Sequence, residues 1–354
     1  MNAEAPVQAG ADAASVFLRN LWYMAGLARD VARGQLRRQI LLGEPVLVGR
    51  MRDGKVFALR DSCPHRGVPL SAGRVANETV ECPYHGWRFR ADGVCAAIPS
   101  LVEGQDMDPA RIRVRAYPAV EQDGLIWIYM AAPGHETATP PNAPPKVPIA
   151  NAKPRWVESQ TFHCNIDHAV IGLMDPAHAP YVHGRWWWRK TPRVKAKDYA
   201  PLPTGFVMMR HAPSKAAYKI LGGGVTTEIT FELPGTRFEN IARGGRANDV
   251  VGLTTCTPID ADTTQVTQVF YWPAWLGFIK PFFSALGPVF LGDDRRMVEL
   301  QREGLKFNPR LMLIQDADMP AIWYHRLKKA WAESVATGAP FANPVQETTL
   351  RWRS

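Results

Sequence analysis

Two short segments decide the fold of the first third of this chain: Cys63–Gly67 reads CPHRG, and Cys82–Trp87 reads CPYHGW. Each segment supplies one cysteine and one histidine, with sixteen residues between the first histidine and the second cysteine. A proline follows each cysteine and a glycine lies soon after, so both segments are expected to form short, stiff turns. The pattern predicts one metal centre held by Cys63, His65, Cys82 and His85.

A set of two cysteines and two histidines fits two kinds of centre. Zinc sites of this composition usually take both cysteines from one element and both histidines from another. In a Rieske [2Fe–2S] cluster two cysteines hold one iron and two histidines hold the other, so two mixed segments bind both irons at once. The mixed order therefore favours the Rieske cluster, with structural zinc as the alternative.

The two strings resemble the Rieske domain of ring-hydroxylating and O-demethylating oxygenases, and this resemblance implies an all-β N-terminal domain. The nearby sequence agrees, because residues 45–59 form two short apolar runs around the turn-forming pair Asp53-Gly54. We expect this domain to span residues 17–132. It follows a flexible, Ala-rich tail at 1–16 that lacks the basic and apolar regions of a signal peptide.

The composition changes after residue 132. Seven prolines lie between residues 133 and 154, and such a stretch neither pairs as a strand nor continues as a helix. We interpret it as a linker. An expected helix at 167–182 is followed by expected strands at 205–211, 225–233, 249–257 and 264–272 and by a helix from Pro288 onward. This order predicts an α+β second domain at 155–340, followed by a C-terminal tail at 341–354.

The second domain contains a histidine pair that is spaced for a metal. Residues 173–184 read LMDPAHAPYVHG, in which Asp175, His178 and His183 form D-x2-H-x4-H. On a helix Asp175 and His178 share one face and His183 lies roughly 140° round from His178, with Pro180 expected to bend or end the helix. Such a pair suits a 2-His-1-carboxylate facial triad, which leaves positions open for O₂ and substrate. The alternative is two partly buried histidines near a helix end.

The carboxylate of that triad must come from another segment. Residues 293–301 read DDRRMVELQ and resemble the (Glu/Asp)-Asp-x-x-(Val/Ile)-x-Glu-x-Gln pattern of the vanillate O-demethylase and dicamba monooxygenase branch of Rieske non-haem iron oxygenases. In that branch the second acidic residue binds iron, which implies Asp294, with Asp293 as the alternative. Asp316 and Asp318 are weaker candidates. Without a metal, the acidic pair would only stabilise a helix N-terminus.

The resemblance covers roughly residues 20–327 and implies a helix-grip (START-like) antiparallel sheet for the second domain. It also implies a catalytic role for Asp175, because the matching aspartate of the family links a Rieske histidine to a triad histidine. In the family that Rieske histidine belongs to a neighbouring subunit, so a homotrimer is implied. One departure is visible at Gly172, where the branch often has asparagine.

Charge and hydropathy restrict the partners. The formal net charge is +9, without a long basic run or a nucleic-acid module, which indicates an acidic protein partner or a solvated basic surface without a specific partner, and no nucleic acid. Residues 271–292 are almost wholly apolar but contain Lys280 and three prolines, which favours a buried or lid-forming helix over a membrane span. The odd number of cysteines, five, argues against a disulfide framework and for a cytoplasmic location.

The two metal-binding patterns and the family resemblance together imply the oxygenase component of a multi-component Rieske monooxygenase with a [2Fe–2S] cluster and a mononuclear Fe(II). It is expected to hydroxylate or O-demethylate a small hydrophobic or aromatic substrate with O₂. Electrons are expected from NAD(P)H through a separate reductase or ferredoxin, because the chain has no glycine-rich dinucleotide motif. Trp186–Trp188 are expected to line the substrate entrance or to pack against a neighbouring subunit or the sheet. The alternatives are a cis-dihydroxylating dioxygenase and a Rieske electron-transfer protein with a ligand-binding second domain.

Overall fold

The computed structural model describes residues 17–136, 139–184, 193–213, 223–244 and 248–354. The chain divides into two compact units, Arg19–Lys146 and Val147–Ser354, with Leu18 grouped with the second. The boundary falls inside the proline-rich stretch at 133–154. The expected limits of the linker and of the two domains stay predictions, and the tail expected at 1–16 lies outside the described residues.

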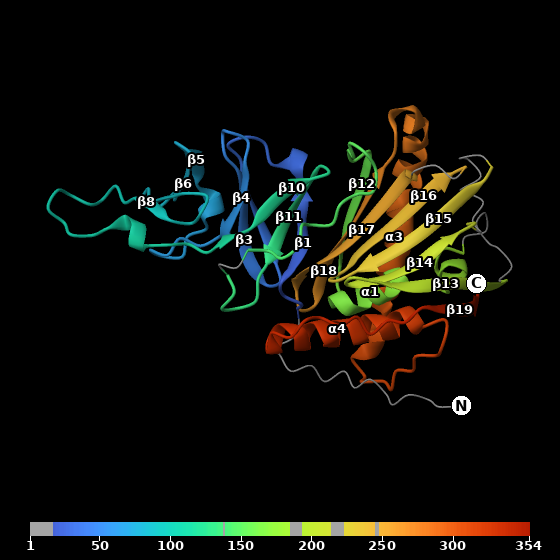
Figure 1. Cartoon of the computed structure of the whole chain (residues 1–354). Helices are drawn as coiled ribbons and strands as arrows, with labels where there is room; N and C mark the ends of the chain where they lie inside the picture. The colour runs from blue at the N-terminus through green and yellow to red at the C-terminus, as the bar shows by residue number, and fades with distance from the viewer. Residues whose placement is uncertain (1–16, 137–138, 185–192, 214–222, 245–247) are drawn as a thin grey trace. The chain divides into compact units, whose positions relative to one another are not determined.

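The first unit consists of β-strands and three short 3-10 helices within its described residues, which confirms the all-β expectation. Its strands form a sheet of order β1-β11-β10, a second of order β2-β3-β4-β9 and a third of order β5-β6-β7-β8 (Figure 1). The elements are β1 (Leu21–Leu27), η2 (Ala28–Asp30), β2 (Leu36–Leu41), β3 (Glu44–Arg50), β4 (Val56–Arg60), η3 (Leu70–Ala72), β5 (Arg74–Ala76), β6 (Thr79–Glu81), β7 (Arg88–Phe89), β8 (Cys95–Ala97), η4 (Pro109–Arg111), β9 (Ala116–Tyr117), β10 (Ala119–Gln122) and β11 (Leu125–Met130).

Local sequence explains two parts of this unit. The expected hairpin is present as β3 and β4, and the Asp53 carboxylate accepts a hydrogen bond from the Lys55 amide at 2.9 Å in the turn between them. Strand β11 lies between β1 and β10 and is buried at all six positions. Its unbroken apolar sequence, LIWIYM, is typical of a strand covered on both faces.

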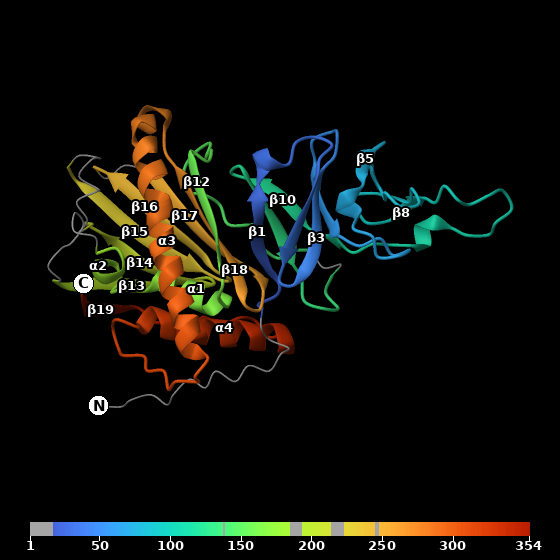
Figure 2. The same ribbon diagram turned by 180° about the vertical axis from the view of Figure 1, so that it is seen from behind.

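The second unit is one eight-stranded antiparallel sheet with helices packed on it, as the α+β expectation requires. The strand order is β12-β18-β17-β16-β15-β14-β13-β19. Figures 1 and 2 show α3 running across one face of this sheet. The elements are β12 (Trp156–Phe162), α1 (Ile166–Met174), α2 (Ala179–Val182), β13 (Val194–Leu202), β14 (Gly205–His211), β15 (Val225–Glu232), β16 (Thr236–Arg243), β17 (Asn248–Asp260), β18 (Thr263–Tyr271), η6 (Ala274–Ile279), α3 (Lys280–Leu305), α4 (Met319–Thr337) and β19 (Thr348–Arg353).

Aromatic side chains hold the helices on the sheet. Trp323 of α4 packs on Phe206 of β14, with ring centroids 5.1 Å apart. Helix α3 comes so close to β12 that a Cβ at Gly287 would lie 2.2 Å from the Trp156 ring. Only glycine allows this approach, so the position of α3 depends on a residue without a side chain.

The helix expected at 167–182 is interrupted in the structure. Helix α1 ends at Met174, and the short α2 begins at Ala179. Asp175 and His178 therefore lie on the connection between two helices and not on one helix face, which corrects the sequence interpretation. The reason is Pro176, which disfavours helical geometry at Asp175. Pro180 lies in the first turn of α2, where proline is favoured, so it begins a helix instead of ending one.

The helix expected from Pro288 begins eight residues earlier, at Lys280. Pro281 occupies its first turn, where the missing amide hydrogen costs nothing. Pro288 lies inside the helix, and its carbonyl accepts a hydrogen bond from the Gln160 side chain at 3.1 Å.

The tail expected at 341–354 contains a strand, which is a second correction. Strand β19 pairs with β13 along Thr348–Arg353. Leu350 and Trp352 are buried while their neighbours are exposed, so the segment has the period of two that belongs to a sheet edge. The Ser354 hydroxyl then donates to the Pro176 carbonyl at 3.2 Å, which joins this strand to the connection between α1 and α2.

Candidate metal centres

Two loops of the first unit have the same backbone geometry. The Cys63 amide donates to the carbonyl five residues on, at 2.9 Å, and its carbonyl accepts from the Gly67 amide at 2.8 Å. Cys82 makes the same two bonds, at 2.8 Å to the carbonyl five residues on and at 3.1 Å from Gly86. Both glycines are left-handed, with φ of +73° and +70°. The repeated sequence pattern thus folds twice into one kind of turn.

The four side chains on these loops form a buried pair and a more exposed pair. Cys63 and Cys82 are 2% and 3% exposed, whereas His65 is exposed and His85 is half-buried. The two imidazole rings lie 4.6 Å apart, and the Trp87 ring stacks on His65. Burial, reinforced by the neighbouring Cys82 thiol, raises the pKa of Cys63 to about 11. Paired thiols inside and paired imidazoles outside fit the two irons of a Rieske cluster.

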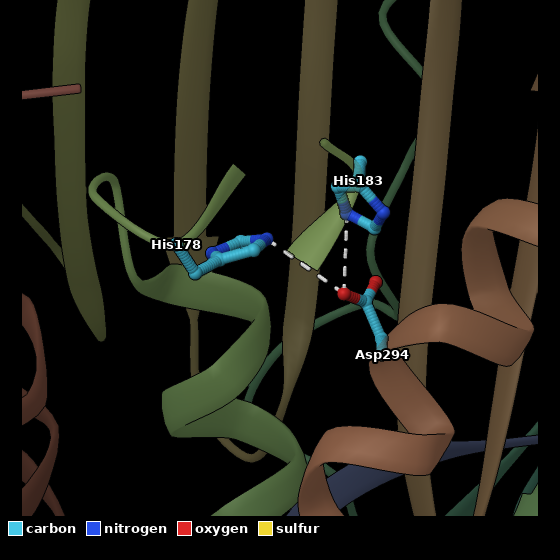
Figure 3. Close-up of side chains that lie close together, drawn as sticks. All are labelled: His178, His183 and Asp294. Atoms are coloured by element: carbon cyan, nitrogen blue, oxygen red, sulfur yellow. Dashed lines mark ion pairs between the residues drawn. The ribbon is translucent and has the colours of Figure 1, made fainter. Parts of the chain in front are cut away.

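The second unit brings Asp294 together with His178 and His183, which lie more than a hundred residues earlier in the chain (Figure 3). The Asp294 Oδ1 atom lies 3.2 Å from His183 Nε2 and 3.7 Å from His178 Nε2. Three potential ligand atoms of this set lie within 4.8 Å of one another. Two ligands at right angles around one ion are about 3 Å apart when each bond is about 2.1 Å. The group therefore has the size of a facial triad.

His178 is oriented by the backbone beside it. Its Nδ1 lies 2.7 Å from the Asp175 carbonyl, to which the ring N–H donates in the tautomer that leaves Nε2 free. The Asp175 carboxylate accepts from the Ala177 amide at 2.7 Å, which fixes the connection that carries both residues. Burial lowers the pKa of His178 and outweighs the opposing effect of Asp294, which favours the neutral ring that metal binding requires.

His183 is held by packing. It is 8% exposed, and its ring lies 4.7 Å from the Phe290 ring. Its buried Nδ1 has no hydrogen-bond partner among the described residues, and the Asp293 Oδ2 atom lies 3.7 Å away. Consecutive helix residues point about 100° apart, so Asp293 approaches the back of His183 while Asp294 approaches both Nε2 atoms.

The other acidic candidates occupy different places. The Asp175 side chain is 32% exposed, and its Oδ2 lies 3.8 Å from His178 Nδ1. Asp318 accepts from the Ile314 amide at 2.8 Å and lies outside the triad. Asp316 likewise is not part of that group. Of the acidic residues singled out in the sequence, the structure thus places Asp294 between the two histidines.

A cavity of about 370 Å³ opens beside the triad. Asp175, His178 and Asp294 line it together with apolar residues of β12, α1 and α3. Gln301 and Gly172 also line it, and a Cβ at Gly172 would meet Val298 at an ordinary 3.7 Å. Glycine at position 172, where the family branch often has asparagine, therefore leaves room in the cavity. Trp186–Trp188 lie outside the described residues, so their expected place at the entrance stays a prediction.

Helix α1, which leads into the metal-binding connection, is fastened to α4 by a polar cluster that spacing did not suggest. The Asp167 carboxylate accepts from the Tyr324 hydroxyl at 2.8 Å and from the Lys328 ammonium at 2.7 Å. His168 and His325 are half-buried at the same contact, and burial lowers the pKa of each. Tyr324, His325 and Lys328 of α4 are spaced i, i+1, i+4, as residues near one face of a helix can be. Nothing in the sequence pairs them with Asp167.

This cluster predicts a pH-dependent stability. In the unfolded chain both histidines regain a pKa near 6.5, so the unfolded state takes up protons first as the pH falls. The free energy of unfolding is expected to be highest above about pH 6.5 and to decrease as the pH falls below that value. Thermal unfolding at about pH 7.5 and about pH 5.5 measures the loss. The melting temperature of the double variant His168→Gln/His325→Gln should fall less between these two pH values than that of the unmodified protein. An equal fall in both proteins would refute this origin.

Comparison with known proteins finds two family models in the chain. A Rieske [2Fe-2S] domain matches residues 21–118, and the vanillate O-demethylase oxygenase C-terminal domain matches residues 162–334. The oxygenase component of dicamba O-demethylase from Stenotrophomonas maltophilia is 40% identical over 169 residues, which cover 47% of this chain and 48% of that protein. Chlorophyllide a oxygenase from Chlamydomonas reinhardtii is 34% identical over 351 residues, 93% of this chain and 51% of that protein. The chain thus spans about half the length of the curated relatives it matches.

Solved structures share the fold. Dicamba monooxygenase bound to dicamba is 24% identical and superposes with a TM-score of 0.71, over 91% of this chain and 99% of that one. A mutant of NdmA from Pseudomonas putida CBB5 with caffeine is 21% identical and has a TM-score of 0.68, over 93% and 97% of the two chains. These likenesses confirm the expected α+β architecture, with a Rieske domain followed by an antiparallel-sheet domain.

Proposed function

Because this chain belongs to the Rieske oxygenases that join a Rieske [2Fe-2S] domain to a vanillate O-demethylase oxygenase C-terminal domain, we propose that it is the oxygenase component of a multi-component monooxygenase. One observation carries the proposal: Asp294 Oδ1 approaches the Nε2 atoms of both His178 and His183 beside a cavity. A Rieske electron carrier would not need this second group.

Each part of the chain has a role in the proposed reaction. Cys63, Cys82, His65 and His85 hold the cluster, and His178, His183 and Asp294 hold the iron. When bound, a Rieske cluster supplies single electrons, and a facial-triad iron activates O₂ for transfer to a substrate. The apolar lining of α1 and α3 binds the substrate and excludes water from its surface. Asp293 orients His183 from behind.

The proposed substrate is a small hydrophobic or aromatic molecule. A cavity of about 370 Å³ lies at the lower end of the range for small-molecule sites. The name of the dicamba O-demethylase component supports O-demethylation or hydroxylation over cis-dihydroxylation. A cis-diol product would favour the dioxygenase alternative, so product analysis separates the two.

We further propose that the protein works as a homotrimer. His65 is exposed on one unit, and the Asp175 carboxylate is partly exposed at the cavity of the other. Asp175 then connects two subunits, because its backbone carbonyl accepts from His178 and its carboxylate accepts from a Rieske histidine of the neighbouring subunit. A separate reductase or ferredoxin supplies electrons from NAD(P)H, and the net charge of +9 favours an acidic donor. Five buried cysteines without a disulfide support a cytoplasmic location.

Replacing Cys82 by serine tests the first centre. The variant is expected to lose the Rieske paramagnetic signal and two of about three irons per chain, because a hydroxyl is a poor ligand for that iron. Cys95→Ser is the matched control, since Cys95 is 1% exposed in the same unit but makes no part of the loops. Iron analysis of both variants measures the iron content, and electron paramagnetic resonance of the reduced proteins measures the Rieske signal. Loss of the signal in Cys95→Ser alone would contradict the ligand assignment.

The whole proposal is tested by turnover of aromatic methyl ethers with a surrogate reductase. An active protein should contain about three irons per chain, whereas an electron carrier would contain two and a zinc protein none. A protein that never takes up a third iron is not an oxygenase.

A further inference from the structure

The first turns of η6 and α3 have an exposed aromatic surface. Trp275, Phe278 and Phe282 are 55%, 61% and 41% exposed. The residues between them, Leu276 and Ile279, are buried in the core beneath. Isolated exposed apolar residues are common, but three aromatic side chains within eight positions form a patch that usually marks a binding surface.

This stretch has the hydropathy of a membrane segment. Ala274–Leu305 contains a stretch that is long and apolar enough to cross a bilayer by length and composition alone, and most of that stretch is not buried. The same helix packs against β12 at Gly287 and carries Asp294 to the two histidines. A helix that is part of the metal site cannot leave the unit to span a bilayer, so the apolar surface needs a different explanation.

The charges around this surface are mostly positive. The sheet register brings together the beginnings of β12, β15 and β17 and the ends of β16 and β18. Among the described residues 151–156, 223–226, 241–244, 248–251 and 271–285, one is acidic. This residue, Asp249, has a buried Oδ2 atom. The basic residues at this end are Lys153, Arg155, Arg243 and Lys280.

The aromatic and basic groups meet at one projecting end of the unit. The Arg243 guanidinium lies 5.4 Å from the centre of the Trp275 ring. Arg155 donates from Nε to the Trp272 carbonyl at 3.0 Å. In both Figures 1 and 2 the beginning of α3 projects beyond the ends of the strands beside it. Tryptophan and phenylalanine beside lysine and arginine are the composition of surfaces that lie in the lipid headgroup region.

We propose that this end of the second unit docks on an anionic lipid bilayer. We name it the aromatic tip, and it consists of Trp275, Phe278, Phe282, Lys153, Arg155, Arg243 and Lys280. The aromatic rings enter the headgroup region, and the basic side chains attract acidic lipids. Binding is peripheral and depends on ionic strength, since part of it is charge attraction.

Vesicle sedimentation of the full iron-loaded protein tests this docking. The protein is expected to sediment with phosphatidylcholine–phosphatidylglycerol vesicles, weakly with phosphatidylcholine alone, and to be released by salt. Trp275→Ser/Phe278→Ser should weaken binding by about tenfold or more, because two rings that enter the lipid headgroup region are lost. Lys280→Glu should weaken it by about fivefold or more, since one basic charge near such a surface contributes about that factor. Phe307→Ser/Met312→Ser is the matched control, because these residues are 85% and 82% exposed away from the aromatic tip.

The outcomes are decisive in either direction. Absence of binding to the mixed vesicles overturns the proposal, as does equal weakening in the control variant. Analytical ultracentrifugation identifies the rival occupant: if Trp275→Ser/Phe278→Ser lowers the oligomeric state, the surface is a subunit contact and the bilayer assignment is wrong. The visible absorption and iron content of each variant report its folding. Lys280→Glu changes one exposed side chain and keeps the test valid if the double variant misfolds.

Discussion

Replacing Asp294 by alanine is expected to remove the mononuclear iron and to lower turnover by about a thousandfold or more, while the Rieske absorption persists. Its Oδ1 atom is the shared point of the triad, 3.2 Å from His183 Nε2 and 3.7 Å from His178 Nε2. Loss of a partner that only orients a ligand typically costs 10- to 100-fold in metal affinity or activity. Loss of the ligand itself leaves two imidazoles without a carboxylate, which hold Fe(II) poorly.

Asp293→Ala is the matched control for this prediction. Asp293 is the adjacent residue on the same helix, but its Oδ2 approaches the other nitrogen of His183, at 3.7 Å. We expect it to lower turnover by about 10- to 100-fold and to keep most of the iron. Iron analysis and steady-state turnover measure both variants. If the two variants exchanged these effects, Asp293 would be the ligand and the assignment of Asp294 would be wrong.

Replacing Asp175 by asparagine is expected to lower turnover by about a hundredfold or more with both metal centres still loaded. The substitution keeps the backbone carbonyl that orients His178 and a side-chain oxygen that can accept from the Ala177 amide. It removes the negative charge that strengthens the hydrogen bond from the Rieske imidazole of the neighbouring subunit. The defect should therefore lie in electron delivery, and iron content should be unchanged.

Rapid-mixing measurements locate that defect. The visible absorption of the reduced cluster, followed after mixing with substrate and O₂, should change about a hundredfold more slowly in Asp175→Asn than in the unmodified protein. Asp318→Asn is the control, because Asp318 also lines the cavity but holds a loop through the Ile314 amide. Equal rates in Asp175→Asn and the unmodified protein would exclude the linking role.

The sequence predicted the parts of the metal centres that depend on local spacing. The CPH and CPYH segments specify their own turns, and D-x2-H with a following histidine places three side chains along nine residues of chain. The choice between Asp293 and Asp294 needed family resemblance at first. The structure separates them by helix phase, because neighbouring residues on α3 face different nitrogens of the histidines.

Other parts were not predictable because their partners are distant in sequence. The Asp167 cluster depends on the packing of α1 against α4, across more than 150 residues of chain. Strand β19 was expected as a tail because an edge strand with two buried residues has a weak pattern until its partner β13 is known. The interrupted helix was misjudged for another reason: Pro176 ends α1 by disfavouring helical geometry at Asp175, and Pro180 begins α2 where the sequence interpretation had it bend or end a helix.

The close contact of Gly287 with Trp156 has a consequence for engineering of the substrate range. Gly287 and Asp294 are seven positions apart on α3, so they face the same side of the helix, two turns from each other. A methyl group at position 287 would collide with the Trp156 ring and push α3 away from β12. The Asp294 carboxylate on the same helix would then move away from His178 and His183. Mutant libraries that vary the apolar lining of the cavity therefore need to keep glycine at position 287, although this residue is not part of the lining.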